Sequence, residues 1–388
     1  MVSEEAALSR LLPKSAIEAR ATSFVLSLAC KAYFFGSHVI LPETELLPMN
    51  LEELKSTAKA LVADDKGLLA MDESTPTCNK RFADAGIPQT IEARSAYREW
   101  IVATPGLSDS ISGVILYDET IRLTVSGGRS FVRLVTDAGI IPGIKVDLGA
   151  KPLAGHFGER VTEGLDGLRE RLNEYARMGV RFAKWRAVIA IGNGIPSRAC
   201  IESNALLLAL YASLCQEAGL VPIVEPEVIM DGDHSMERCS VVTEEVLRAV
   251  FASLDTQRVA LDGMILKPNM VLPGLSCAEQ PSLDQVAAAT VTCLKKAVPI
   301  DVAGIAFLSG GQSSRLASER LNTMNFLCRA DLPWPLAFSF ARAIQQPALE
   351  IWKGIEANVP AAQMSLNHRA LCNKAALHGN YTEYLETH

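Results

Sequence analysis

One lysine of this 388-residue chain stands where its amine could act as a nucleophile. Met264, Ile265 and Leu266 form the uninterrupted apolar run that is typical of a strand covered on both faces. Pro268 has no N–H to donate and favours extended backbone in the residue before it, so Lys267 is expected at the end of this strand. A lysine held against apolar surroundings acquires a lowered pKa and can attack a carbonyl carbon. The alternative is an ordinary lysine whose stem packs while its ammonium group reaches water.

Other charged residues and one glycine-rich turn stand at or near the ends of further apolar runs. They are Asp72, Glu119, Lys145 with Asp147, Lys184 with Arg186, Glu225 with Glu227, Ser309-Gly310-Gly311, and Arg342. Charges at the ends of buried strands are costly unless they pair or bind a ligand. We therefore expect one polar site built from these strand ends. The alternative is a purely structural ring of ion pairs.

These residue types suit the cleavage of a carbon–carbon bond by a lysine. A nearby cation such as Lys184 would favour the neutral amine of Lys267, which could then add to a ketone and form an iminium ion. The iminium ion draws electrons and permits cleavage of a neighbouring C–C bond, a reaction that needs groups to carry protons. Glu225 and Asp72 are the available carboxylates, and Glu227 points to the same side of its strand as Glu225. A salt bridge to a lysine is the alternative role for Glu225.

Two separate basic groups predict a substrate that is phosphorylated at both ends. The turn at residues 309–311 could aim successive N–H groups at an anion, and Arg342 follows the next apolar run. Taken alone, a Ser-Gly-Gly sequence is more often only a turn. The second group follows the first apolar run and contains Ser74, Thr77, Lys80 and Arg81.

The pattern of apolar runs predicts eight strands that alternate with helices. The expected strands are Gly67–Ala70, Gly113–Tyr117, Ile140–Val146, Arg181–Ile189, Leu220–Val224, Gly263–Leu266, Gly304–Leu308 and Leu336–Phe340. The clearest helices are expected at Thr162–Met178, Ala199–Ala218, Thr243–Leu254, Ser282–Ala297 and Ser314–Asn325. A single α/β (β/α)8 TIM barrel at residues 50–347 accounts for this order, and no Gly-x-Gly-x-x-Gly follows a strand to favour an open dinucleotide-binding sheet. Residues 348–388 are expected to form a helix and a polar tail.

Local residues mark several helix ends. Asn50 with Glu53, and Ser282 with Gln285, have the spacing of helix N-terminal caps, while Gly179 and Gly219 suit C-terminal caps. Residues 1–49 are apolar in part but interrupted by charges, so we expect an extension outside the barrel, with a weak organelle-targeting character.

Composition argues against several classes of binding partner and ligand. A formal charge of −7 argues against nucleic acid and against an anionic membrane as partners. The nine cysteines include no Cys-x-x-Cys pair, which suggests reduced thiols. The six histidines are scattered, so no metal site is expected.

Six ordered motifs resemble class I fructose-1,6-bisphosphate aldolases, and residues 111–117, residues 70–72 and Ala341 resemble the plant plastid branch of this family. The six motifs are Leu-Ala-Met-Asp-Glu-Ser-Thr (69–75), Gly-Ile-Lys-Val-Asp (143–147), Phe-Ala-Lys-Trp-Arg (182–186), Val-Pro-Ile-Val-Glu-Pro-Glu (221–227), Leu-Lys-Pro-Asn-Met (266–270) and Phe-Leu-Ser-Gly-Gly-Gln-Ser (307–313). The resemblance covers residues from about 51 to about 382. It implies a TIM barrel, a homotetramer, no cofactor, and reversible cleavage of fructose 1,6-bisphosphate to dihydroxyacetone phosphate and glyceraldehyde 3-phosphate.

The resemblance also implies roles for the residues that match these motifs. Lys267 would form the Schiff base, Glu225 would exchange protons around it, Asp72 would take the hydroxyl proton during cleavage, and Lys184 would support the site, with Glu227 also catalytic. One phosphate would be held by Ser309, Gly310, Gly311, Ser339 and Arg342. The other end of the substrate would be held by Ser74, Thr77, Lys80, Arg81, Lys145 and Arg186.

Three departures from the family pattern are visible. Phe340 lacks the hydroxyl of the family's tyrosine, and Leu148 replaces a lysine that many members carry. Family chains continue beyond residue 382 to a terminal tyrosine, whereas this one ends Tyr384-Leu-Glu-Thr-His388, so we expect reduced turnover or weaker preference for the bisphosphate.

Three other functions are alternatives to the aldolase. A metal-dependent aldolase would need clustered histidines, and a transaldolase would lack the two-ended phosphate sites. A weakened aldolase-like protein with a binding or scaffold role is the remaining alternative. The resemblance of residues 111–117 to plastid members, together with the N-terminal extension, favours the chloroplast, with the cytoplasm as the alternative.

Overall fold

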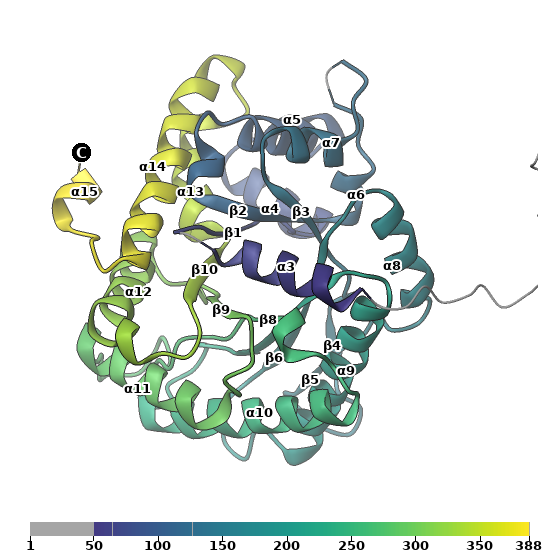
Figure 1. The fold of residues 1–388 in the computed structure, drawn as a ribbon. Coiled ribbons are helices and arrows are strands. Elements are labelled where there is room, and N and C mark those ends of the chain that lie inside the picture. Colours follow the sequence, from purple (N-terminus) through teal and green to yellow (C-terminus); the bar gives the residue numbers. More distant parts are fainter. Residues whose placement is uncertain (1–49, 64, 126, 388) are drawn as a thin grey trace, which may run out of the picture. The chain divides into compact units, whose positions relative to one another are not determined.

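The apolar runs form a closed barrel of parallel strands in the computed structural model, which describes residues 50–387 apart from residues 64 and 126 (Figure 1). The expected extension at residues 1–49 lies outside the described residues. The barrel strands are β1 (Gly67–Ala70), β2 (Ile111–Leu116), β3 (Ile141–Lys145), β6 (Phe182–Ile189), β7 (Val221–Val228), β8 (Ile265–Leu266), β9 (Gly304–Phe307) and β10 (Leu336–Phe340). Their order is β1-β10-β9-β8-β7-β6-β3-β2, and β2 pairs with β1 to close the barrel. The expected TIM barrel is therefore confirmed.

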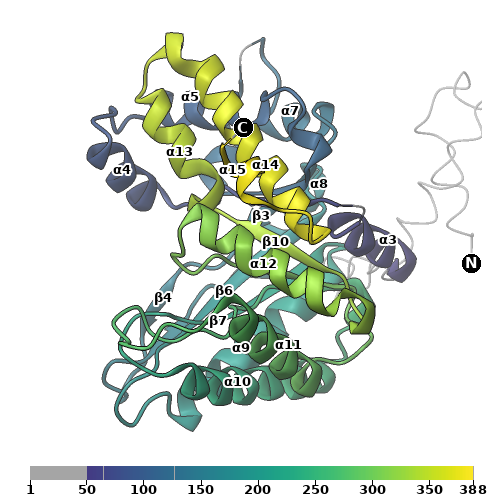
Figure 2. The same cartoon turned by 90° about the vertical axis from the view of Figure 1, so that its left-hand side faces the viewer.

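Helices cover the outside of the barrel (Figures 1 and 2). They are α4 (Thr75–Asp84), α5 (Ile91–Val102), α6 (Asp118–Ile121), α7 (Phe131–Asp137), α8 (Leu168–Arg177), α9 (Arg198–Glu217), α10 (Met236–Thr256), α11 (Leu283–Ala297), α12 (Ser314–Cys328), α13 (Arg342–Trp352) and α14 (Val359–Leu377). The short α15 (Glu383–Thr387) lies outside this layer and contacts α12 and α14 (Figure 1). The expected caps are present: Ser282 and Gln285 form a reciprocal capping box at α11, and Gly179 and Gly219 adopt positive φ after their helices. A further pair of short strands, β4 (Ala150–Pro152) and β5 (Arg160–Thr162), forms an antiparallel hairpin outside the barrel.

Strand side chains divide between two apolar cores because they alternate in direction. In β1, Leu68 and Ala70 face the barrel interior, whereas Leu69 contributes to the layer between strands and helices. The interior core also contains Leu54 and Leu61 of α3 (Leu51–Leu61). This helix therefore seals the end of the barrel at which the strands begin.

Several predicted elements differ in extent. The helix expected at Thr243–Leu254 already begins at Met236, and the strand expected from Gly263 begins at Ile265, after a 3-10 turn at Leu261–Gly263. The helix expected from residue 162 begins at Leu168, because Gly164 and Gly167 take positive φ values of 135° and 63° and interrupt the helical path. The strand expected to end at Val224 continues to Val228 and pairs with β6 along its whole length. Glu225 and Glu227 therefore lie within the strand and not after it.

The C-terminal part is more helical than expected. The boundary placed before residue 348 lies inside α13, which begins directly after β10 and belongs to the barrel's outer layer. Helix α14 corresponds to the helix expected in residues 348–388, and the short helix α15 takes the place of part of the expected polar tail.

Close packing inside the barrel makes a specific prediction at Gly143. A Cβ atom there would lie 2.2 Å from ring atoms of Phe182, a buried residue of the interior core. We expect Gly143→Ala to lower the free energy of unfolding by about 1–3 kcal/mol, as overpacking does. Gly263→Ala is the control, because its nearest contact is 3.2 Å away at the end of the Gln216 side chain. Equal urea-unfolding midpoints for the two variants would contradict this account.

Candidate active site

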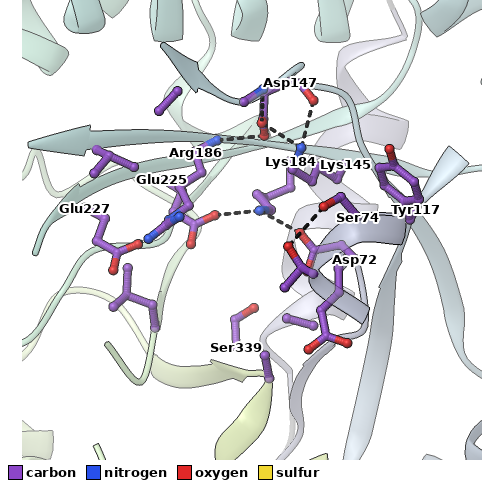
Figure 3. Close-up of a pocket in the computed structure, with 18 of the residues that line it drawn as sticks. Asp72, Ser74, Tyr117, Lys145, Asp147, Lys184, Arg186, Glu225, Glu227 and Ser339 are labelled. Atoms are coloured by element: carbon purple, nitrogen blue, oxygen red, sulfur yellow. Dashed lines mark hydrogen bonds and ion pairs between the residues drawn. The ribbon is translucent and has the colours of Figure 1, made fainter. Parts of the chain in front are cut away.

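A cavity of about 1060 Å³ opens at the carboxyl ends of the barrel strands. Every residue that the sequence predicted for catalysis or phosphate binding lines it: Asp72, Ser74, Thr77, Lys80, Arg81, Lys145, Lys184, Arg186, Glu225, Glu227, Lys267, Ser309, Gly310, Gly311, Ser339 and Arg342. Figure 3 shows labelled members of this set projecting into the same space from neighbouring strands. The convergence of strand ends thus brings together residues that are up to 270 positions apart.

Lys267 lies at the base of the cavity beside one carboxylate. Its backbone N–H donates to Val224 O at 2.8 Å, which extends the pairing of β8 with β7 and places its side chain next to that of Glu225. The distance from Lys267 Nζ to Glu225 Oε1 is 3.2 Å. Both side chains are 4% exposed, so the pair is shielded from bulk water. The expected position of Lys267 is confirmed. It directly follows β8, and its side chain is buried and does not reach bulk water.

Glu225 also contacts a second lysine through its other oxygen. Lys184 Nζ lies 3.0 Å from Glu225 Oε2 and 2.7 Å from Asp72 Oδ2. The four side chains therefore form a continuous buried row of alternating charge, Lys267–Glu225–Lys184–Asp72. Figure 3 shows the contacts of Lys184 with both carboxylates.

The charges within this row decide its protonation. Burial opposes ionisation of Asp72, but the cations of Lys184 and Lys267 outweigh it and lower the pKa of Asp72 to about 2. Burial is likewise outweighed by Lys184 and Lys267 at Glu225, whose pKa is lowered. Burial would lower the pKa of Lys184, but Asp72 and Glu225 raise it. Lys184 is consequently a permanent cation, and both acids are carboxylates that can accept protons.

Two other predicted cations are held by neighbouring acids. Lys145 Nζ lies 2.7 Å from Asp147 Oδ1 and donates to Asp147 O at 2.8 Å. Arg186 forms an ion pair with Glu227, which raises the pKa of Arg186 despite its burial. Both cations line the cavity, but their charges are partly compensated before any ligand binds.

The Ser-Gly-Gly turn after β9 faces Arg342. Gly310 and Gly311 adopt φ values of 57° and 89°, a backbone region that favours glycine, and Gln312 N donates to Ser309 O at 3.0 Å to close the turn. A Cβ atom on Gly311 would lie 3.7 Å from Arg342 Nη2. The buried Ser339 Oγ has no hydrogen-bond partner among the described residues. Backbone N–H groups, a guanidinium group and a free hydroxyl are therefore available to one anion.

The second basic group is carried by the first turns of α4. Ser74 is the N-cap residue of this helix, and its Oγ lies 3.0 Å from Thr77 Oγ1. Arg81 forms an ion pair with Glu73 and donates to Gln346 Oε1 of α13 at 3.0 Å. Lys80 is exposed at the cavity edge.

Glu119 does not belong to the cavity, contrary to its placement among the strand-end charges. It lies in α6, where the chain has already turned outward after β2, and pairs with Arg94 at 2.6 Å and Arg98 at 3.3 Å. Thr75 Oγ1 donates to the same carboxylate at 3.2 Å. Glu119 therefore stabilises the start of α4 through Thr75, from outside the cavity.

Several lining residues were missed by the sequence reasoning. Tyr117 directly follows β2, so the strand-end rule could have identified it. Arg171 and Tyr175 reach the cavity from α8, and no local signal in the sequence indicates this. Within residues 50–387, apart from 64 and 126, no group of three or more metal-ligating side chains is found.

The charge state of Asp72 makes stability depend on acid pH. Its pKa is about 2 in the fold, against 3.8 for an ordinary aspartate, so the unfolded chain takes up the proton first. Stability from Asp72 is thus fully present above about pH 4 and is lost as the pH falls towards 2. Between these pH values, we expect the unfolding free energy to fall by about 2 kcal/mol more in the parent chain than in Asp72→Asn. Urea unfolding at several pH values measures this, and identical pH profiles would refute it.

Comparison with known proteins gives the same assignment as the site. Residues 53–388 match the family model described as fructose-bisphosphate aldolase class-I. A protein of Xanthomonas campestris named probable fructose-bisphosphate aldolase class 1 is 56% identical over 334 residues, which are 86% of this chain and 99% of that protein. The non-muscle-type fructose-bisphosphate aldolase of Lethenteron camtschaticum is 46% identical over 87% of this chain and 92% of its own. The fructose-bisphosphate aldolase of Plasmodium falciparum, solved with TRAP and a small-molecule inhibitor, superposes with a TM-score of 0.84 at 46% identity, covering 85% of this chain and 95% of that one. With its barrel and the contents of its cavity, the chain belongs to the class I fructose-bisphosphate aldolase family.

Proposed function

We propose that this chain reversibly cleaves fructose 1,6-bisphosphate to dihydroxyacetone phosphate and glyceraldehyde 3-phosphate, with Lys267 as the amine that forms a Schiff base. The observation that carries the proposal is the 3.2 Å contact between Lys267 and Glu225 at the base of a cavity that also holds two phosphate-binding groups. A nucleophilic amine within reach of a proton acceptor is the arrangement that carbonyl addition requires.

During imine formation, Glu225 acts first as a proton acceptor and then as a proton donor. It takes the proton from the Lys267 ammonium group, and the freed amine adds to the C2 ketone of the substrate. The protonated Glu225 then gives its proton to the hydroxyl group of the carbinolamine, which leaves as water. The neighbouring Lys184 lowers the pKa of Glu225 and so makes it a ready proton donor at this step.

Asp72 starts the cleavage of the carbon–carbon bond. As a carboxylate with a pKa of about 2, it is ionised at neutral pH and accepts the proton of the C4 hydroxyl group. The C3–C4 electrons move into the iminium group, the aldehyde leaves, and an enamine remains on Lys267. Protonation of the enamine at C3 and hydrolysis release the ketone product and restore the amine.

The two basic groups bind the two phosphates of the substrate. One phosphate is held by the turn at residues 309–311 together with Ser339 and Arg342. The other phosphate is held by the α4 group, with Lys80 and Arg81. Lys145 and Arg186 contribute from the same wall, although each is already paired with an acid. The intact buried row of charges favours this activity over a scaffold role without catalysis.

Reduction with borohydride in the presence of dihydroxyacetone phosphate tests the proposal. We expect a covalent mass on the parent chain, which peptide mass spectrometry places at Lys267. Lys267→Met removes the amine and is expected to abolish the adduct and to lower kcat by a factor of about 1000 or more. Lys295→Met, an exposed lysine of α11 outside the cavity, is the control and should behave like the parent. An adduct that persists in Lys267→Met would exclude this mechanism.

We also propose that the chain belongs to the plastid-like branch, functions in the plastid stroma, and serves the Calvin cycle as well as glycolysis and gluconeogenesis. The support is the resemblance of residues 111–117 and the weak targeting character of residues 1–49. Sequencing of the mature N-terminus from source cells is expected to show cleavage upstream of the barrel. An intact Met1 would favour the cytoplasm instead.

A homotetramer is a further proposal that rests on family resemblance. Large apolar side chains such as Phe157, Phe326 and Leu327 are exposed and would suit subunit contacts.

A further inference from the structure

A buried arginine lies behind the Ser-Gly-Gly turn. Arg320 belongs to α12, the helix that follows this turn, and is only 5% exposed. Its Nη1 donates to Gln312 Oε1 at 2.7 Å, and Gln312 is the residue directly after Gly311. The buried Nε of Arg320 has no hydrogen-bond partner among the described residues.

Within residues 50–387, apart from 64 and 126, the Arg320 guanidinium group has no ion-pair partner. None of the ion pairs among the described residues includes Arg320, and the adjacent Glu319 pairs with Arg315 on the surface of α12. Burial lowers the pKa of Arg320 to about 10, and Glu319 offsets this only in part. An unpaired buried cation is costly, and an apolar side chain would fill the same space without that cost. The cost is understandable if the guanidinium group acts on an anion that binds nearby.

Gln312 connects Arg320 to the phosphate-binding turn. Its side chain is 9% exposed, and its Nε2 lies 3.7 Å from Met270 Sδ on the segment that follows Lys267. Its backbone N–H closes the turn on Ser309 O. The Gln312 side chain therefore links the turn both to the buried arginine and to the segment that follows the reactive lysine.

We propose that Arg320 is a positioning residue, which holds Gln312 and thereby the Ser309-Gly310-Gly311 turn in the conformation that binds a phosphate group of the substrate. Its uncompensated charge also adds a favourable potential for that phosphate. The proposal deepens the proposed function, on which it rests for the identity of the ligand.

The test separates phosphate binding from imine chemistry. Arg320→Met keeps the approximate length of the side chain but removes the charge and the donors. We expect the Kd for inorganic phosphate, measured by titration calorimetry, to rise about tenfold. KM for the bisphosphate should rise similarly, with kcat within about twofold. Borohydride trapping of unphosphorylated dihydroxyacetone at Lys267 should be unchanged, which a general loss of structure would not allow.

Four further variants complete the experiment. Arg320→Lys keeps a charge and a donor and should restore part of the phosphate affinity. Gln312→Met should reproduce the effect of Arg320→Met, and the double variant should lose little more, since the two residues act in series. Arg315→Met, an exposed arginine of the same helix, is the control and should leave phosphate affinity unchanged.

The opposite outcomes are equally clear. Unchanged phosphate affinity in Arg320→Met, or an equal loss of phosphate binding and of dihydroxyacetone trapping, would overturn the positioning role. Failure of the parent chain to be trapped at Lys267 would instead overturn the proposed function. The calorimetric comparison would still decide whether Arg320 controls the turn.

Discussion

The buried row of alternating charges is the constraint on which the site depends. Glu225 contacts a lysine through each of its oxygens, and Lys184 in turn contacts Asp72. Two cations and two anions compensate one another, so the row tolerates burial only as a complete set. Its geometry needs rigid supports, and the strands of a closed barrel supply them. Strands β6, β7 and β8 are neighbours and position Lys184, Glu225 and Lys267, whereas Asp72 comes from β1, which is not adjacent to them. The backbone hydrogen bond from Lys267 N–H to Val224 O positions the residue that carries the reactive amine.

Much of this site could be predicted because parallel strands end on one face. Lys267, Glu225, Lys184 and Asp72 each stand at or near the end of an apolar run, and closure of the barrel brings them together. The rule fails at Glu119, where the chain turns into α6 immediately after β2. That carboxylate then meets arginines of α5, and the sequence holds no sign of the pairing.

The contacts between side chains could not be predicted from the sequence. The resemblance placed Lys145 and Arg186 among the cations that hold the substrate, but it did not indicate the acidic partner that the fold gives each of them, two residues away for Lys145 and on the next strand for Arg186. The late start of α8 depended on the backbone conformations of Gly164 and Gly167, and periodicity alone does not register these. The resemblance of motifs, and not periodicity or spacing, identified the substrate and the reaction.

Helix α3 has a consequence for the stability of the chain. Because its apolar side chains fill the end of the barrel where the strands begin, residue 50 joins the fold on the side remote from the reactive lysine. Substitutions in this helix can therefore change the stability of the barrel while leaving untouched the residues that line the mouth through which sugar phosphates enter.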